Sequence, residues 1–171
     1  NKFNLICVGR NIKNKSFKNK KIKYIKWNFL DFAKSKLFFL EKESIIINCV
    51  GKNSSKEKDL HNLNVIFIKK LLNYIKINKL AVRLIHLGSV SVYGAEKKYC
   101  NKIFNITESS PLSSYDLYSK SKIESDLLIQ NYSRKNNNDF SFTILRIANV
   151  FSNSNNPKSF RLINYLLTKG I

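Results

Sequence analysis

Apolar residues follow two patterns along the chain: short continuous or alternating runs, and longer stretches with helical spacing. Runs of the first kind predict strands, at Phe3–Val8, Ile22–Phe29, Ser44–Val50, Leu80–Leu87 and Phe140–Ile147. Stretches of the second kind predict helices, at Phe32–Leu40, Asp59–Ile77, Tyr115–Lys135 and Lys158–Lys169. In the third of these helices the apolar residues are Ile123, Leu127, Leu128 and Tyr132. After the first two strands, helices and strands therefore alternate along the chain, and no internal repeat is visible.

Two polar motifs follow the fourth predicted strand and open the third predicted helix. The first, His86 to Gly94, reads HLGSVSVYG, and the second, Tyr118 to Lys122, reads YSKSK. Residues four apart on a helix share one face, so Tyr118 and Lys122 lie side by side. A phenol beside an ammonium group forms an acid/base pair, because the positive charge favours the phenolate. Ser89, at the carboxyl end of the strand, adds a hydroxyl for the same substrate oxygen. This set suits proton transfer coupled to hydride transfer at a carbinol or carbonyl carbon.

Together the two motifs resemble the extended short-chain dehydrogenase/reductase family, also called the NAD-dependent epimerase/dehydratase family. Its pattern is a strand, Ser-Ser-x-x-Val-Tyr-Gly, an acidic residue with prolines, and Tyr-x-x-x-Lys opening a helix. The positions that match in order are Ser89 to Gly94, Glu108, Pro111, Tyr118 and Lys122. The resemblance implies that Ser89, Tyr118 and Lys122 are catalytic. The alternative is a surface helix that carries its tyrosine and lysine by chance.

The resemblance also implies a cofactor, NAD or NADP, and residues that contact it. Besides Tyr118 and Lys122, these are Arg10, Asn28, Phe29, Cys49, Val50, Gly51 and Asn64. Asn28 and Phe29 occupy the place of an adenine-binding Gly-Asp-hydrophobic motif, with Asn28 replacing the usual Asp. In the family, an asparagine at the place of Asn64 braces the strand beside the active site; an ordinary helix asparagine is the alternative. Arg10 favours NADP, because an Arg there can accommodate a 2′-phosphate, and an exposed loop arginine explains it equally well.

A nucleotide sugar is the substrate that the resemblance implies, with contacts from Ser89, Ser91, Tyr93 and Asn149. Asn149 lies in a segment that resembles the family's Leu-Arg-x-x-Asn-Val-Tyr-Gly, which lines the nicotinamide and the sugar. The 4,6-dehydratases of the family tend to carry Thr-Asp-Glu where this chain has Ser89-Val90-Ser91. Neither Val nor Ser does carboxylate chemistry at neutral pH, so dehydration is disfavoured, and epimerisation and reduction stay open.

The glycine-rich loop of the family is missing from the sequence. Five glycines are present, and no three have the Gly-x-x-Gly-x-x-Gly spacing that cradles a pyrophosphate. The chain also begins with Asn1 rather than Met, so we expect a cropped or processed start. We therefore interpret residues 1–171 as a partial NAD(P)-binding Rossmann-like domain, and we expect these residues alone to bind NAD(P) weakly or not at all. The alternative is a non-catalytic Rossmann-like remnant that binds a partner or a nucleotide without turnover.

The expected fold class is α/β: a doubly wound parallel sheet, Rossmann-like, with helices on both faces and incomplete at the first strand. The predicted strands correspond to strands two to six of the order 3-2-1-4-5-6. Without the central first strand, Phe3–Val8 and Ser44–Val50 lose their shared neighbour and show unpaired backbone groups. We expect that another segment or chain fills this gap, or that the two halves close onto each other. The family tends to have a small residue at Phe67, so the distance between helix and sheet can differ here.

The charge and the composition add little to this interpretation. Of the 171 residues, 31 are Lys or Arg and 11 are Asp or Glu, which gives a net charge of +20. Such a charge suits nucleic-acid binding. However, Lys, Asn and Ile dominate the whole chain and no nucleic-acid-binding motif stands out, so we favour compositional drift. A positive field still attracts anionic nucleotides.

The remaining residues predict no further chemistry. Cys7, Cys49 and Cys100 lack metal-ligand spacing, and Cys7 and Cys49 lie in apolar runs, which favours buried free thiols and a cytoplasmic protein. His86 lies within a predicted strand, where we expect a satisfied core or edge histidine. We expect no metal, and no apolar run is long enough to cross a membrane. A homodimer is compatible with the resemblance.

Overall fold

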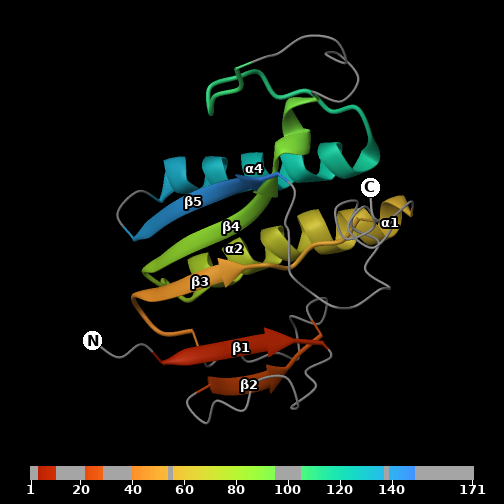
Figure 1. The fold of residues 1–171 in the computed structure, drawn as a ribbon. Helices are drawn as coiled ribbons and strands as arrows, with labels where there is room; N and C mark the ends of the chain where they lie inside the picture. The colour runs from red at the N-terminus through yellow and green to blue at the C-terminus, as the bar shows by residue number, and fades with distance from the viewer. Residues whose placement is uncertain are drawn as a thin grey trace, which may run out of the picture.

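The computed structural model of the chain describes residues 4–10, 22–28, 40–53, 56–94, 105–136 and 139–148. In these segments three strands come first, and helices then separate the third, fourth and fifth strands (Figure 1). The strands are β1 (Leu5–Gly9), β2 (Ile22–Lys26), β3 (Ser44–Asn48), β4 (Val82–Ser89) and β5 (Phe140–Ile147). The helices are α1 (Glu57–Leu60), the π-helical η1 (His61–Ile66), α2 (Phe67–Ile77), the 3₁₀-helical η2 (Val90–Tyr93) and α4 (Leu117–Lys135).

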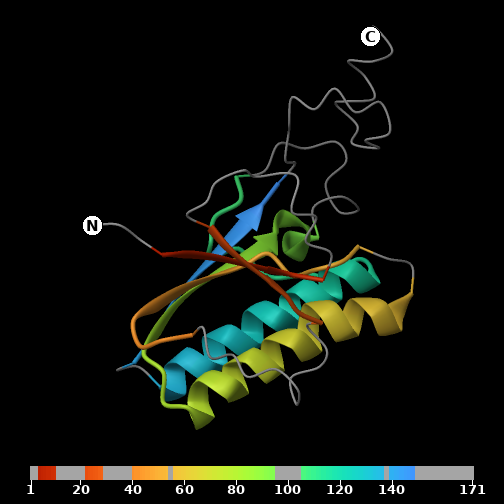
Figure 2. The same cartoon turned by 90° about the horizontal axis from the view of Figure 1, so that it is seen from below.

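All the strand pairs are parallel, as predicted, and they form two sheets. One sheet has β1 beside β2, and the other has the order β3-β4-β5. Figure 2 shows α2 and α4 side by side on one face of the sheets. In the described part of the chain these helices cover one face. The sequence predicted helices on both faces, but two of the predicted helices, Lys158–Lys169 and most of Phe32–Leu40, lie outside the described residues. The arrangement confirms a Rossmann-like α/β fold.

The gap expected between the first and third strands is present in the described residues, because no hydrogen bond pairs β1 with β3. The two sheets are joined instead through side chains on the helical face. Trp27, directly after β2, packs against Phe67 of α2, with ring centroids 6.2 Å apart. Phe67, which stands where the family tends to have a small residue, therefore provides a large surface for this contact. The main core lies between α2, α4 and the larger sheet, around Leu84, Ile75 and Ile129.

Helix α4 starts at a defined point because it has a capping box. The Asp116 carboxylate accepts a hydrogen bond from the backbone N–H of Ser119, and the Ser119 hydroxyl accepts one from the N–H of Asp116. Such reciprocal caps satisfy backbone groups that the first turn leaves without partners. The cap places Tyr118 in the first turn of the helix and Lys122 one turn later.

Candidate active site

A cavity of about 310 Å³ opens at the carboxyl ends of β3, β4 and β5, next to the start of α4. Among the residues that line it are Cys49, Val50, Gly51, Ser89, Tyr118 and Lys122. In open parallel sheets, ligands bind outside the carboxyl ends of the strands. Two segments that are far apart in the sequence, the strand tip at Ser89 and the helix start at Tyr118, therefore meet at a place suited to a ligand.

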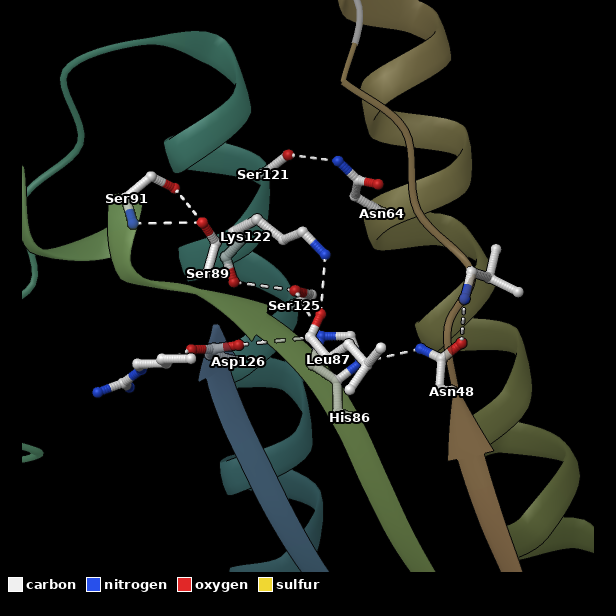
Figure 3. Close-up of polar contacts among 12 residues, drawn as sticks. Asn48, Asn64, His86, Leu87, Ser89, Ser91, Ser121, Lys122, Ser125 and Asp126 are labelled. Atoms are coloured by element: carbon white, nitrogen blue, oxygen red, sulfur yellow. Dashed lines mark hydrogen bonds and ion pairs between the residues drawn. The ribbon is translucent and has the colours of Figure 1, made fainter. Parts of the chain in front are cut away.

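Lys122 lies at the floor of this cavity. Its side chain is buried, and its ammonium group donates a hydrogen bond to the Leu87 carbonyl at 3.0 Å (Figure 3). The same nitrogen lies 5.9 Å from the centre of the Tyr118 ring. Burial lowers the pKa of Lys122, and the nearby Asp126 carboxylate opposes this shift. The backbone of β4 thus holds a positive charge beside the tyrosine.

Ser89 is arranged as a hydrogen-bond donor. Its hydroxyl oxygen accepts a hydrogen bond from the Ser91 hydroxyl at 2.9 Å and a longer one from the Ser91 backbone N–H at 3.3 Å (Figure 3). A hydroxyl oxygen has two acceptor positions and one hydrogen. Because Ser91 occupies both acceptor positions, the hydrogen of Ser89 is left for donation to a group in the cavity.

Asn64 supports the cavity from behind and does not line it. Its buried side-chain oxygen accepts from the Lys52 N–H at 2.9 Å, and its amide nitrogen donates to the Lys52 carbonyl at 3.0 Å. The same nitrogen donates to the Ser121 hydroxyl at 2.9 Å. Asn64 therefore ties the segment after β3 to α4, which is the bracing role that the resemblance implies. It lies in the π-helical turn η1, a distortion that is frequent at functional sites.

Gly51 leaves space that a side chain would occupy. A Cβ atom at this position would lie 3.3 Å from both the Lys122 ammonium nitrogen and the Asn64 side-chain oxygen. Contacts of this length are tighter than ordinary van der Waals packing. The absence of a side chain at residue 51 therefore leaves space beside the Lys122 ammonium group.

Ser91 and Tyr93, predicted to contact substrate, are not among the residues that line the cavity. The Ser91 hydroxyl bonds to Ser89, and the buried Tyr93 hydroxyl accepts a hydrogen bond from the Arg146 guanidinium at 2.6 Å. The Arg146 guanidinium also donates to the Asp126 carboxylate at 3.1 Å. Ser91 therefore acts on the cavity through Ser89, and Tyr93 contacts Arg146 rather than the cavity.

The residues predicted to contact the adenosine part of the cofactor do not line the cavity where the structure describes them. Arg10 and Asn28 are exposed and are not among the residues that line the cavity. The pKa of Asp59 is lowered mainly by Lys52, with which it forms an ion pair. Phe29 and Asn149 lie outside the described residues.

A buried polar cluster beneath the cavity was not predicted as functional. The sequence indicated a satisfied histidine at His86, and the structure confirms it: the Nδ1 atom of His86 lies 2.9 Å from the side-chain nitrogen of Asn48. Burial, and then Lys122, lower the pKa of His86 to about 4. Burial raises the pKa of Asp126, and Arg146 opposes this. A polar residue inside the apolar run Ser44–Val50 is the sequence signal that could have identified Asn48.

Two kinds of site are absent from the described segments. No group of three His, Cys, Asp or Glu side chains there could hold a metal ion. In the same segments, no helix combines the length and the apolar character that a membrane crossing needs.

Comparison with known proteins gives a family and a fold. The sequence profile of the NAD dependent epimerase/dehydratase family matches residues 2–170. The sequence matches none of the curated proteins significantly. Among solved structures, the chain is similar to a UDP-N-acetylglucosamine 4-epimerase from Methanobrevibacter ruminantium, with a TM-score of 0.77 and 17% identity over 98% of this chain and 56% of the other.

Two further structures have the same fold. A UDP-glucuronic acid 4-epimerase from Bacillus cereus in complex with NAD gives a TM-score of 0.71 and 20% identity, over 95% of this chain and 55% of the other. A dTDP-glucose 4,6-dehydratase from Bacillus anthracis in complex with NAD gives 0.66 and 19%, over 88% and 45%. The chain thus spans about half the length of the solved structures it resembles.

Proposed function

The chain belongs to the NAD-dependent epimerase/dehydratase family, and on this premise we propose that the protein is an NAD(P)-dependent nucleotide-sugar epimerase or reductase. Residues 1–171 are then its partial NAD(P)-binding domain. The observation that carries the proposal is that Ser89, Tyr118 and Lys122 line one cavity at the carboxyl ends of parallel strands. Chance motifs on a surface helix would not meet a strand tip in this way.

Each of the three side chains has a role that follows from its surroundings. The Tyr118 phenol exchanges a proton with the hydroxyl or carbonyl oxygen of the sugar, as general acid and base. The Lys122 ammonium, held by the Leu87 carbonyl, places its charge beside the phenol, 5.9 Å from the centre of the Tyr118 ring. Ser89 donates its free hydrogen to the same sugar oxygen. The bound cofactor supplies the acceptor or donor of hydride.

The residues around the cavity fit the nicotinamide side of such a cofactor. Gly51 leaves room beside the Lys122 ammonium group, and the Cys49–Gly51 backbone offers polar groups at the strand end. NAD is supported by its presence in related structures.

Epimerisation and reduction are the reactions that the site supports. Elimination of water needs an additional acid and base beside the substrate, and positions 90 and 91 carry Val and Ser. The Ser91 hydroxyl donates its hydrogen to Ser89, which makes it a support for Ser89 rather than a base. Cys7 and Cys49 are free thiols, but neither is buried: Cys7 is half-buried, and Cys49 is exposed because it follows the end of β3. Free thiols are compatible with a cytoplasmic enzyme, and a homodimer stays a prediction.

Product analysis of the protein, isolated as the cell makes it, tests this proposal. The protein is incubated with NAD(P) and a panel of UDP- and dTDP-sugars, and the products are followed by NMR spectroscopy. We expect conversion of one sugar to its epimer, or oxidation or reduction at one carbon with a matching change in cofactor absorbance. Tight NAD(P) binding without any conversion would favour the non-catalytic alternative. A 4,6-dehydrated product would contradict the assignment of positions 90 and 91.

A further inference from the structure

A chain of buried polar side chains runs beneath the cavity from β3 through β4 to α4 (Figure 3). Asn48, His86, Ser125 and Asp126 form it, and each is at most 3% exposed. The proposed function gives these residues no part in the chemistry. Burying polar groups is costly unless they are paired, so the arrangement calls for an explanation.

The orientation of the Asn48 amide decides which nitrogen of His86 carries the proton. The Asn48 side-chain oxygen accepts a hydrogen bond from the Val50 backbone N–H at 2.9 Å, and only the oxygen of an amide side chain can accept. The amide nitrogen therefore faces the Nδ1 atom of His86, at 2.9 Å. Because an amide nitrogen only donates, Nδ1 is the acceptor, and the ring proton is on Nε2.

The opposite side of the ring leads independently to the same tautomer. The Nε2 atom lies 3.4 Å from the Ser125 hydroxyl and 3.9 Å from one oxygen of Asp126. Ser125 donates its own hydrogen to the Lys122 carbonyl at 2.9 Å, so toward His86 it can only accept. This Asp126 oxygen has no hydrogen-bond partner in the described residues, while the other accepts from Arg146. Both neighbours of Nε2 are therefore acceptors.

Charge in this region favours a neutral ring. Asn48 faces the ring from β3, and Lys122 and Asp126 approach from α4; Arg146 of β5 neutralises the other side of Asp126. A second ring proton would point at the amide hydrogens of Asn48. Burial and the Lys122 charge lower the pKa of His86 to about 4, which agrees with this geometry.

We propose that Asn48 and His86 form a positioning pair that fixes both walls of the cavity relative to each other. Asn48 holds the N–H of Val50, in the middle of the Cys49–Gly51 segment that follows β3. His86 is followed directly by Leu87, whose carbonyl binds the Lys122 ammonium. Asn48 and His86 are register partners at the end of the β3–β4 ladder, and the hydrogen bond between their side chains extends this pairing to the segment after β3 and to the strand that positions Lys122. The functional part of this inference rests on the proposed function, because it takes the cavity to be the NAD(P) site.

Nitrogen-15 NMR of the histidine side chains tests the geometry in the chain as it stands. His61, the other histidine, is exposed, and the spectrum of the His86→Asn variant assigns the two rings. We expect His86 to carry its proton on Nε2 at every pH from about 5 to 8. A proton on Nδ1, or titration in this range, would overturn the inference. Asn48→Asp keeps an oxygen for Val50 and removes the donor, so the His86 proton should move to Nδ1; an unchanged tautomer would also count against the pair.

Cofactor affinity of the protein, isolated as the cell makes it, tests the positioning role. His86→Leu removes the acceptor for Asn48, and we expect NAD⁺ to bind about tenfold more weakly, since a buried donor loses its partner. His86→Asn places an acceptor near the position of Nδ1 and should recover most of this loss. The KM for NAD⁺ should rise while kcat at saturating NAD⁺ changes little.

The outcomes separate this inference from the proposed function. If the unmodified protein binds NAD⁺ and both His86 variants bind it equally well, the positioning role is wrong and the proposed function stands. If the unmodified protein binds no NAD(P), the proposed function fails together with the positioning role. The NMR result still decides the tautomer in that case. If His86→Leu does not fold, Asn48→Ala, which removes the hydrogen bonds to both His86 and the Val50 N–H, replaces it in the affinity measurement, with a weaker affinity expected and an unchanged one contradicting the role.

Discussion

Replacing Ser91 by Ala should slow turnover only through Ser89. The variant removes the hydroxyl that donates to the Ser89 oxygen at 2.9 Å and keeps the backbone N–H. The Ser89 hydroxyl can then rotate, and its hydrogen is no longer directed into the cavity. A neutral hydrogen bond contributes about 0.5–1.5 kcal/mol, so kcat should fall roughly two- to tenfold. Ser91→Thr keeps a hydroxyl and should restore most of the rate.

A double-mutant cycle distinguishes this effect from a general loss of packing. Ser89→Ala removes a donor to the reacting oxygen, for which a loss of about a hundredfold or more in kcat is typical. In that background Ser91→Ala should cost nothing further, because the oxygen that Ser91 orients is gone. Steady-state kcat of the four proteins is the measurement. Equal losses from Ser91→Ala with and without Ser89 would refute the reasoning, since Ser91 would then act independently.

Three further predictions concern stability and the cavity. Arg146→Met leaves the buried Asp126 carboxylate without its ion-pair partner and should lower the free energy of unfolding by about 3–5 kcal/mol in urea titrations. Arg134→Met, at an exposed position of α4, is the control. A decrease of the same size in both variants would contradict this prediction. The pKa of His86 is about 4 in the folded chain and 6.5 ordinarily, so the unfolded chain binds the extra proton as pH falls through this window. The free energy of unfolding should then fall by up to about 3 kcal/mol as the pH is lowered from about 6.5 to 4. The raised pKa of Asp126 acts in the opposite direction. His86→Asn should remove the decrease that is due to His86, and an unchanged decrease would contradict this assignment. Gly51→Ala crowds the Lys122 ammonium group and should weaken NAD⁺ binding with little change in thermal stability. An unchanged affinity would show that the segment after β3 has room for a side chain.

The sequence predicted the frame of the fold because its strands are short apolar runs and its motifs have fixed spacing. Ser89 and Tyr118 could be expected in one place, since a strand end and the start of the next helix meet at the same edge of a parallel sheet. The gap beside β1 could also be predicted, because the glycine-rich first strand is missing from the sequence. The contact between Trp27 and Phe67 could not be predicted, because the sequence positions of these residues do not indicate how the two sheets are joined.

Helix α4 shows why the supporting residues were harder to predict. Its apolar residues suggested the buried stripe, yet Leu127 is 43% exposed and the fully buried positions include Ser125 and Asp126. These polar residues are buried because Arg146 and His86 reach them from neighbouring strands. Such partners are decided by tertiary structure and leave no periodic signal in the sequence of the helix.

The central claim is that the Tyr118 phenol transfers the proton in the reaction. Tyr118→Phe removes only the hydroxyl, while the ring and the Lys122 ammonium stay in place. The direct test compares the unmodified protein and the variant, each isolated from cells as the natural full chain. It measures kcat with the nucleotide-sugar substrate and Kd for NAD(P) in both proteins. We predict that kcat falls to background and that Kd stays within about twofold of the unmodified value, since one neutral hydrogen bond contributes little to binding. An unchanged kcat in this variant would contradict the account.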